Sequence, residues 1–330
     1  MLLEVKDLTV QFATEAGLLT AVEDVSFEVK AGEVVGIVGE SGCGKSVTAL
    51  SILRLIPRPP GRFARGRIVF KGQDLLSLPL GALRQIRGKQ IGMIFQEPMT
   101  ALSPLKRVGR QMVEILRVHE PGLSKAQAWA TATRWLASVG IPAPAERMHS
   151  YPFQLSGGMR QRVMIAMALM LHPALLIADE PTTALDVTIQ AQVFELIREM
   201  KADDTSLLLI THDMGVIWEL CDRVLVMYAS HIVEAGDTDA LFDDPRHPYT
   251  RGLLRAMPRL DAGREQLEAI EGQVPSPLDY PPGCHFCARC PIAIERCHTE
   301  APPLERLADG RQVACFRATE PLSDGEDRHG

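Results

Sequence analysis

Two short runs of the sequence combine residue types that could bind a nucleotide and its metal ion. The first, residues 39–46, reads Gly-Glu-Ser-Gly-Cys-Gly-Lys-Ser and fits the phosphate-binding pattern G-x-x-x-x-G-K-[ST]. Its glycines would let backbone N–H groups curl around phosphate oxygens at the start of a helix. Lys45 would reach the outer phosphates, and the Ser46 hydroxyl would ligate Mg²⁺. The expected nucleotide-binding residues are Gly39, Ser41, Gly42, Cys43, Gly44, Lys45, Ser46 and Val47.

The second run places two carboxylates at the end of an apolar segment. Residues 175–178 are all apolar and predict a buried strand, which Asp179 and Glu180 follow directly. Asp179 would complete the Mg²⁺ shell, and Glu180 would polarise the water that attacks the γ-phosphate. An acidic pair after a strand is by itself more often an ordinary surface feature, and a glycine-rich turn can match the phosphate pattern by chance. Each run therefore strengthens the interpretation of the other.

Composition limits the class of protein in which this chemistry is expected. The chain has 330 residues, 46% of them hydrophobic, which is enough for one large α/β domain and an appendage. A net charge of −6 argues against a nucleic-acid partner. The first ten residues lack the regions of a signal peptide, and the apolar stretch 163–178 is too short to span a bilayer. We therefore expect a cytoplasmic protein that reaches a membrane only through a partner.

Apolar strands that alternate with helices predict a mostly parallel sheet flanked by helices. Helical spacing over about residues 97–170 predicts an inserted subdomain, and proline becomes dense beyond Asp243. We expect a nucleotide-binding domain over 1–245 and a Cys/Pro-rich extension over 246–330, with a disordered tail after Pro321. The expected strands are 3–12, 21–29, 33–38, 67–71, 91–95, 175–178, 207–210 and 224–228, and helices are expected from Lys45 onward and over 188–200.

Further motifs, in the same order along the chain, resemble those of the ABC ATPase family. Residues 155–159, Leu-Ser-Gly-Gly-Met, resemble the family's signature motif, usually LSGGQ. The resemblance covers residues 1 to about 245 and implies an α/β fold: a P-loop NTPase (RecA-like) core with antiparallel β and helical subdomains. Met159 departs from the pattern. The departure puts little in doubt, because the family's phosphate contacts come from Ser156, Gly157 and Gly158.

The resemblance implies roles for single residues. Gln96 would be the Q-loop glutamine and a further Mg²⁺ contact, and His212 would be the switch histidine; with Glu180 they form the expected catalytic set. Asp186 would belong to the D-loop, and Phe12 would lie against the adenine ring. In the family, the signature motif of one subunit caps the ATP bound to the other. A head-to-tail dimer that ATP closes and hydrolysis opens is therefore implied.

Three stretches narrow the resemblance to importers of dipeptides, oligopeptides and nickel: 95–109, 247–254 and the proline-rich run that leads to Gly283-Cys284 and Arg289-Cys290-Pro291. Such importers join two ATPase subunits, often non-identical, to two membrane subunits and an external binding protein. A groove near residues 96–108 would receive a helix of a membrane subunit. The implied function is ATP-driven uptake of peptides or a related small solute at the inner face of the membrane.

Two other functions share the nucleotide motifs. An exporter ATPase would lack the Pro/Cys extension. An ABC ATPase that acts on nucleic acid or ribosomes would carry a long coiled-coil insertion or a second cassette, and the sequence shows neither.

Five of the seven cysteines fall between Cys284 and Cys315, a density that argues for metal or redox chemistry in a cytosolic chain. The run C-x2-C-x2-C is similar to ferredoxin spacing. The importer branch uses Cys284, Cys290, Cys297 and Cys315, which in some members ligate a [4Fe–4S] cluster, and Cys287 would be a reserve thiol. Zinc held by four thiolates and free, reduced thiols are the competing assignments. A cluster would serve to fold the extension.

Overall fold

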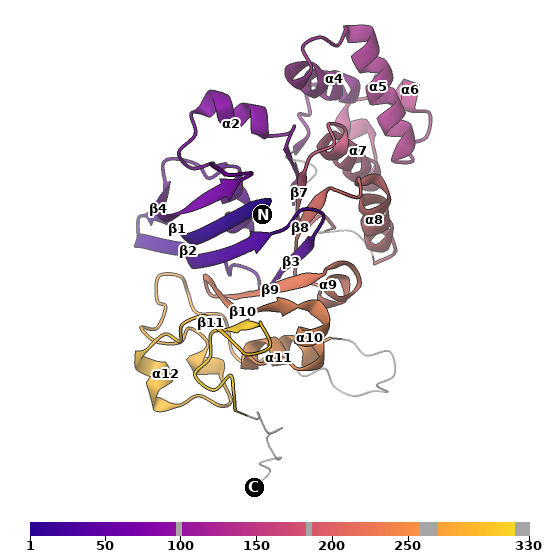
Figure 1. The fold of residues 1–330 in the computed structure, drawn as a ribbon. Helices are drawn as coiled ribbons and strands as arrows, with labels where there is room; N and C mark the ends of the chain where they lie inside the picture. Colours follow the sequence, from indigo (N-terminus) through magenta and orange to yellow (C-terminus); the bar gives the residue numbers. More distant parts are fainter. Residues whose placement is uncertain (97–100, 183–186, 258–269, 321–330) are drawn as a thin grey trace.

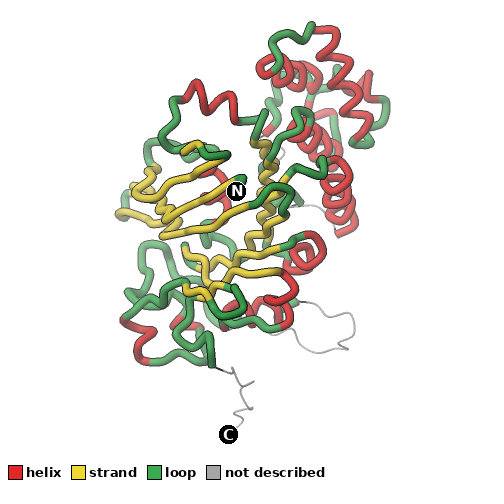
Figure 2. The backbone as a smooth tube through the Cα atoms, in the orientation of Figure 1, coloured by secondary structure: helices red, strands yellow, loops and turns green. Residues whose placement is uncertain are grey.

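The structure is a computed structural model that describes residues 1–96, 101–182, 187–257 and 270–320 (Figure 1). Two sheets occupy the middle of the molecule. A group of helices lies at one end and the C-terminal extension at the other, as the backbone view shows (Figure 2). None of the helices in these ranges combines the length and the hydrophobicity of a membrane-spanning segment.

A small antiparallel sheet is built mainly from the N-terminal part of the chain. Its strands are β1 (Leu3–Thr14), β2 (Gly17–Val29), β4 (Gly61–Phe70) and β5 (Gln73–Asp74), in the order β2-β1-β4-β5. Along β1 the buried residues alternate as Leu3 and Val5, and then resume as Leu8 and Val10. A strict period of two would turn the second pair outward. A bulge with Asp7 in the left-handed region (φ 49°) corrects the register.

The larger sheet has five parallel strands at its centre. These are β3 (Val34–Val38), β6 (Ile91–Ile94), β7 (Leu175–Asp179), β8 (Ser206–Thr211) and β9 (Arg223–Tyr228); β10 (His231–Asp237) then pairs antiparallel with β9. Their order is β10-β9-β3-β8-β7-β6. Both faces of β8 are buried: Leu207 and Leu209 pack into one core and Leu208 and Ile210 into the other. Such double burial explains the continuous apolar runs.

Helices cover this sheet and form the inserted arm. Beside the sheet lie α1 (Lys45–Ile52), α7 (Gly157–Leu169), α8 (Val187–Met200), α9 (Met214–Leu220), α10 (Thr238–Asp243) and α11 (Pro248–Arg255), and α2 (Leu80–Ile86) follows the small sheet. The arm holds α4 (Val108–His119), α5 (Lys125–Ser138) and α6 (Pro144–Arg147) (Figure 1). Ser124 begins α5 with a capping box to Gln127.

The expected strands are present, but two begin several residues earlier than expected and β10 was not predicted. β2 begins at Gly17, four residues before the predicted start. The strand predicted over 67–71 begins at Gly61, because it pairs with β1 as far as Phe12. Exposed arginines at 62, 65 and 67 hide the strand pattern in the sequence. Asp186 and the tail after Pro321 lie outside the described residues.

The C-terminal extension adds two short strands to the larger sheet. β12 (Gln312–Val313) pairs antiparallel with β10, and β11 (Glu305–Arg306) pairs with β12; α12 (Glu295–Thr299) precedes both. At the predicted boundary, the buried carboxylate of Glu234 accepts hydrogen bonds from the backbone N–H groups of Arg246 (2.8 Å) and His247 (2.9 Å). The extension is thus continuous with the core sheet, and the boundary near residue 245 stays a prediction.

Candidate functional site

The glycine-rich loop connects β3 to α1 in a backbone form that demands glycine. Gly39 (φ 156°) and Gly44 (φ 104°) have left-handed angles, and a Cβ at either position would collide with a backbone carbonyl of a neighbouring strand. Lys45 is only 4% exposed, and its Nζ donates to the carbonyl oxygens of Gly39 (2.8 Å) and Glu40 (3.0 Å). The loop therefore holds a buried ammonium at its centre, which is the arrangement that suits phosphate.

The end of β7 lies against the first turn of α1. The Ser46 hydroxyl donates to Asp179 Oδ1 at 2.9 Å, which joins residues 133 positions apart. Burial raises the pKa of the Asp179 carboxyl, and the hydrogen bond from Ser46 opposes that shift. A desolvated carboxylate beside a hydroxyl is an oxygen pair that Mg²⁺ prefers as ligands. The residues present therefore fit the expected metal.

The three predicted catalytic side chains, those of Gln96, Glu180 and His212, meet at Glu180, the residue after Asp179. Gln96 Nε2 donates to Glu180 Oε2 at 3.1 Å, and His212 Nδ1 lies 3.7 Å from the same oxygen. The Glu180 side chain is 12% exposed, whereas that of His212 is 62% exposed. Glu180 has a left-handed backbone (φ 42°), a strained conformation for a residue with a Cβ. The strain aims its carboxylate at the two neighbours that follow β6 and β8.

The signature residues form the N-terminal end of α7, and the surface at this end is not covered by other parts of the described chain. The Ser156 hydroxyl accepts a hydrogen bond from Met159 N (3.3 Å), and no acidic residue lies in the first turn of the helix. A Cβ added to Gly157 or Gly158 would meet no atom within 4 Å. The packing of this chain therefore does not require either glycine. Within the described residues no hydrogen bond joins this segment to the phosphate loop.

Two other nucleotide-site predictions have defined places. Phe12 is half-buried near the end of β1, opposite Gly61 of β4. Cys43 is fully buried, with its Sγ 3.8 Å from Lys45 Nζ, and burial raises the pKa of its thiol. A buried thiol of raised pKa stays protonated and unreactive at neutral pH.

None of the five clustered cysteines forms a disulfide. Backbone hydrogen bonds join Cys284 N to Cys297 O (2.8 Å) and Cys287 N to Cys284 O (3.0 Å). Burial, followed by neighbouring thiols, raises the pKa of Cys284 to about 12 and that of Cys290 to about 11. Within the described residues, no three of these sulfurs lie within 4.8 Å of one another.

Comparison with known proteins assigns the family. Residues 22–183 match the family described as ABC transporter, and residues 233–297 match the C-terminal region of oligopeptide/dipeptide transporters. The chain is 51% identical to the oligopeptide transport ATP-binding protein OppD of Salmonella typhimurium, over 98% of this chain and 95% of that protein. The chain belongs to the ABC transporter family. It is also 50% identical to the dipeptide transport ATP-binding protein DppD of Escherichia coli, over 98% of each.

A solved ABC structure extends the likeness to the fold. The ATP-binding cassette MJ0796, in a dimeric post-hydrolysis state bound to ADP and phosphate, superposes with a TM-score of 0.64 at 26% identity. The match covers 72% of this chain and 98% of that one. The P-loop NTPase fold is confirmed, and so is the interpretation of the chain as the ATP-hydrolysing subunit of an ABC importer. The exporter and nucleic-acid alternatives gain no support.

Three contacts of this ABC ATPase were not predicted. The buried side chain of Gln161, on α7, donates to the backbone carbonyl of Pro181, next to Glu180. The Tyr249 hydroxyl, on α11, accepts from Glu40 N at 2.8 Å. Arg289, in the extension, binds the Glu40 carboxylate with both terminal nitrogens (2.6 and 3.1 Å). The importer-type stretches contain Tyr249 and Arg289, but no local pattern pairs either with residue 40.

Proposed function

We propose that this ABC ATPase powers the uptake of peptides or a related small solute. Support comes from the match of residues 233–297 to the oligopeptide/dipeptide transporter region, together with near full-length similarity to OppD and DppD. The partners would be two membrane permease subunits, a second ATPase subunit and, indirectly, an external substrate-binding protein. The chain would then be peripheral, on the cytoplasmic face of the inner or plasma membrane.

The observation that carries the catalytic assignment is that polar residues at the ends of β6, β7 and β8 meet one another beside the start of α1. Ser46 and Asp179 would hold Mg²⁺, with Gln96 as an additional contact, and Lys45 would bind the outer phosphates of ATP. Glu180 would orient and polarise the attacking water, and His212 would sense the γ-phosphate. Phe12 would contact the adenine ring.

The open face of the signature helix supports the head-to-tail dimer. Glycine at 157 and 158 leaves backbone N–H groups at a helix start uncovered, and such a terminus attracts phosphate. Since the chain's own packing leaves this face bare, the anion would be the ATP bound to the second ATPase subunit, and Asp186 would act at the same interface. ATP would then close the dimer and its hydrolysis would open it.

An apolar groove beside the helical arm is the proposed contact with the membrane subunit. Its cavity volume is 530 Å³, and its walls include Leu53, Phe95, Leu102 and Met164. Phe95 is 36% exposed although it directly precedes the Glu180 partner Gln96. A helix of a permease seated here would be linked through residues 95 and 96 to the catalytic carboxylate.

Reconstitution tests the proposed function. The complete transporter is reconstituted in proteoliposomes. It should accumulate a labelled oligopeptide only when ATP is supplied on the side of the ATPase subunits and the external binding protein on the opposite side of the membrane. An otherwise identical assembly with Lys45→Ala should accumulate none, because the ATPase loses nucleotide. Peptide-independent ATP turnover without accumulation of di- or oligopeptides would reject peptides as the solute.

We further propose that Cys284, Cys290, Cys297 and Cys315 hold a [4Fe–4S] cluster that orders the extension. In a zinc site with Zn–S bonds of about 2.3 Å, tetrahedral thiolate sulfurs lie about 3.8 Å apart. Among the described residues no three of these sulfurs come within 4.8 Å of one another, and this arrangement favours a polynuclear cluster over a single zinc ion. Metal binding would release the thiol protons that burial retains. Cys287 remains the reserve thiol, and residues 246–330 remain a proposed separate unit.

Anaerobic purification tests this assignment. We expect about four iron and four acid-labile sulfide per chain, with loss of both in Cys290→Ser. Cys221→Ser should retain them, because Cys221 is buried at the C-terminal end of α9, outside the cysteine group. Stoichiometric zinc without sulfide would replace the cluster by a zinc site. A chain without metal would leave the thiols as a packing feature.

A further inference from the structure

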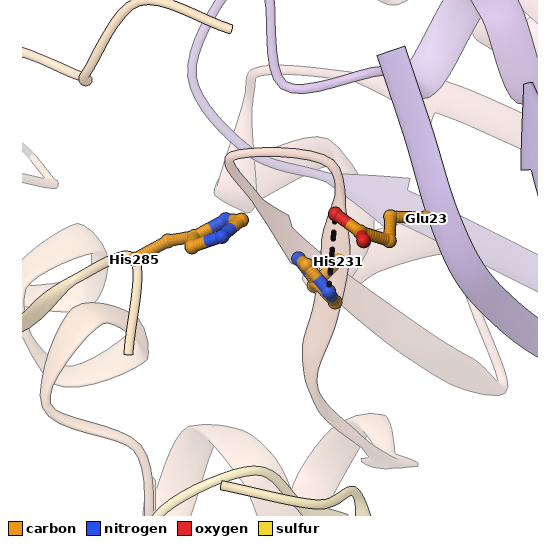
Figure 3. Close-up of side chains that lie close together, drawn as sticks. All are labelled: Glu23, His231 and His285. Carbon is orange, nitrogen blue, oxygen red and sulfur yellow. Dashed lines mark ion pairs between the residues drawn. The ribbon is translucent and has the colours of Figure 1, made fainter. Parts of the chain in front are cut away.

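A second group of potential metal ligands lies outside the nucleotide site and the cysteine group. Glu23 comes from β2, His231 from the first position of β10, and His285 from the extension (Figure 3). One ligand atom of each lies within 4.8 Å of those of the other two, and all three residues are half-buried. Within the described part of the chain, no other histidine, cysteine or acidic residues form such a group.

Both imidazoles are oriented by the same backbone carbonyl. His285 Nδ1 lies 2.7 Å from Ala229 O, and His231 Nδ1 lies 3.3 Å from that oxygen. A carbonyl can only accept, so a hydrogen bond to Ala229 O places a proton on each Nδ1, and in the neutral ring Nε2 is then the nitrogen left for a metal ion. Metal-binding histidines in proteins are typically fixed in this way, with the second ring nitrogen donating to a backbone carbonyl or a carboxylate.

Glu23 completes the group at a distance that leaves room for an ion. Its Oε2 lies 3.8 Å from His231 Nε2, beyond hydrogen-bond range. Two ligands with bonds of about 2.0–2.1 Å to a tetrahedral zinc ion lie about 3.4 Å apart, so little movement is needed. Glu23 N also donates to Ser230 O (3.0 Å), which fixes β2 against the turn that carries His231.

The surroundings hold the rings and leave access for an ion. Tyr280 stacks on His285 with ring centroids 4.3 Å apart, and the His231 and His285 rings meet edge to face at 4.6 Å. A cavity of 250 Å³ reaches the two histidines, with Asp24 also on its wall. An incoming ion and its remaining water ligands would occupy this space.

We propose that Glu23, His231 and His285 bind a divalent transition-metal ion of the zinc class, which clamps the C-terminal extension to the ATPase core. Two imidazoles and one carboxylate favour such an ion over Mg²⁺ or Ca²⁺, which prefer oxygen ligands. The clamp lies next to the nucleotide site, since Ser230 N donates to Cys43 O of the phosphate loop at 3.1 Å. Three protein ligands leave a position for water.

Cobalt binding by the full chain tests the site, because Co²⁺ ligated by nitrogen and oxygen lacks the intense thiolate absorption of a cysteine site. Wild type should take up one equivalent with this spectrum, and His285→Ala and His231→Ala should each weaken it at least ~10-fold. The control is His298→Ala, an exposed histidine of α12 outside the group. Equal uptake by wild type and both histidine variants would overturn the proposal.

A second measurement guards against misfolding of the histidine variants. Glu23→Gln keeps the size of the side chain on a strand of the core, so the fold is expected to survive. Zn²⁺ should slow proteolysis of the extension in wild type and His298→Ala but not in Glu23→Gln, with ATP affinity of the variant as the folding check. The same Zn²⁺ protection in Glu23→Gln would also overturn the proposal.

Discussion

Replacing Glu180 with glutamine is expected to reduce steady-state ATP hydrolysis by at least ~10²-fold while ATP binding is retained. The amide keeps the size of the side chain and can still contact Gln96, but it cannot polarise the attacking water. Asp179 and Ser46, which meet at 2.9 Å, are untouched, so the metal end of the site stays assembled. The measurement is phosphate release by the assembled transporter, with nucleotide affinity measured in parallel.

The matched control for this variant is Lys45→Ala, which should lose the binding of nucleotide itself. Lys45 is the buried ammonium of the phosphate loop, so its removal acts one step before hydrolysis. The two variants therefore separate binding from the chemical step. Turnover of Glu180→Gln at the wild-type rate would remove Glu180 from the catalytic role and leave its contacts with Gln96 and His212 as structural.

Replacing Arg289 with methionine is expected to weaken ATP binding, although residue 289 lies far from the phosphate loop in sequence. The guanidinium makes five hydrogen bonds: two to Glu40 and one each to Tyr228, Ile270 and Glu271. Its side chain is 5% exposed and that of Glu40 is 31% exposed. Removing one partner from a buried ion pair lowers the free energy of unfolding by about 3–5 kcal/mol. The partial exposure of Glu40 places the expected loss toward the lower end of this range.

Hydrogen exchange and nucleotide affinity measure this effect. In Arg289→Met the amides of residues 39–45 and of the extension should exchange faster than in wild type, and ATP should bind more weakly. The control is Arg296→Met. Arg296 is an exposed arginine of α12 that pairs with Glu300, the residue after the helix (2.7 Å), so the change is expected to alter either quantity little. Unchanged exchange at residues 39–45 in Arg289→Met would show that the phosphate loop does not depend on the extension.

The features of this protein that local chemistry dictates could be predicted from the sequence. The phosphate loop needs glycine at particular backbone angles, and Gly39 and Gly44 adopt those angles. Buried parallel strands need continuous apolar runs, so strands were predicted over residues 33–38 and 175–178, and the structure places them at 34–38 and 175–179. Because Asp179 and Glu180 directly follow such a run, their carboxylates could be placed at the end of a strand. Motif order was enough to indicate the family, and the comparisons confirmed it.

Contacts between polar residues far apart in the sequence could not be predicted and became visible only in the folded chain. Glu40 with Arg289, and Glu23 with His231 and His285, are joined across roughly 200 positions or more, and single polar residues leave no periodic pattern in a sequence. The pairing of β12 with β10 was equally hidden, because a two-residue strand is too short to show alternation. Such contacts depend on the packing of the extension against the sheet. That packing is a property of the whole fold.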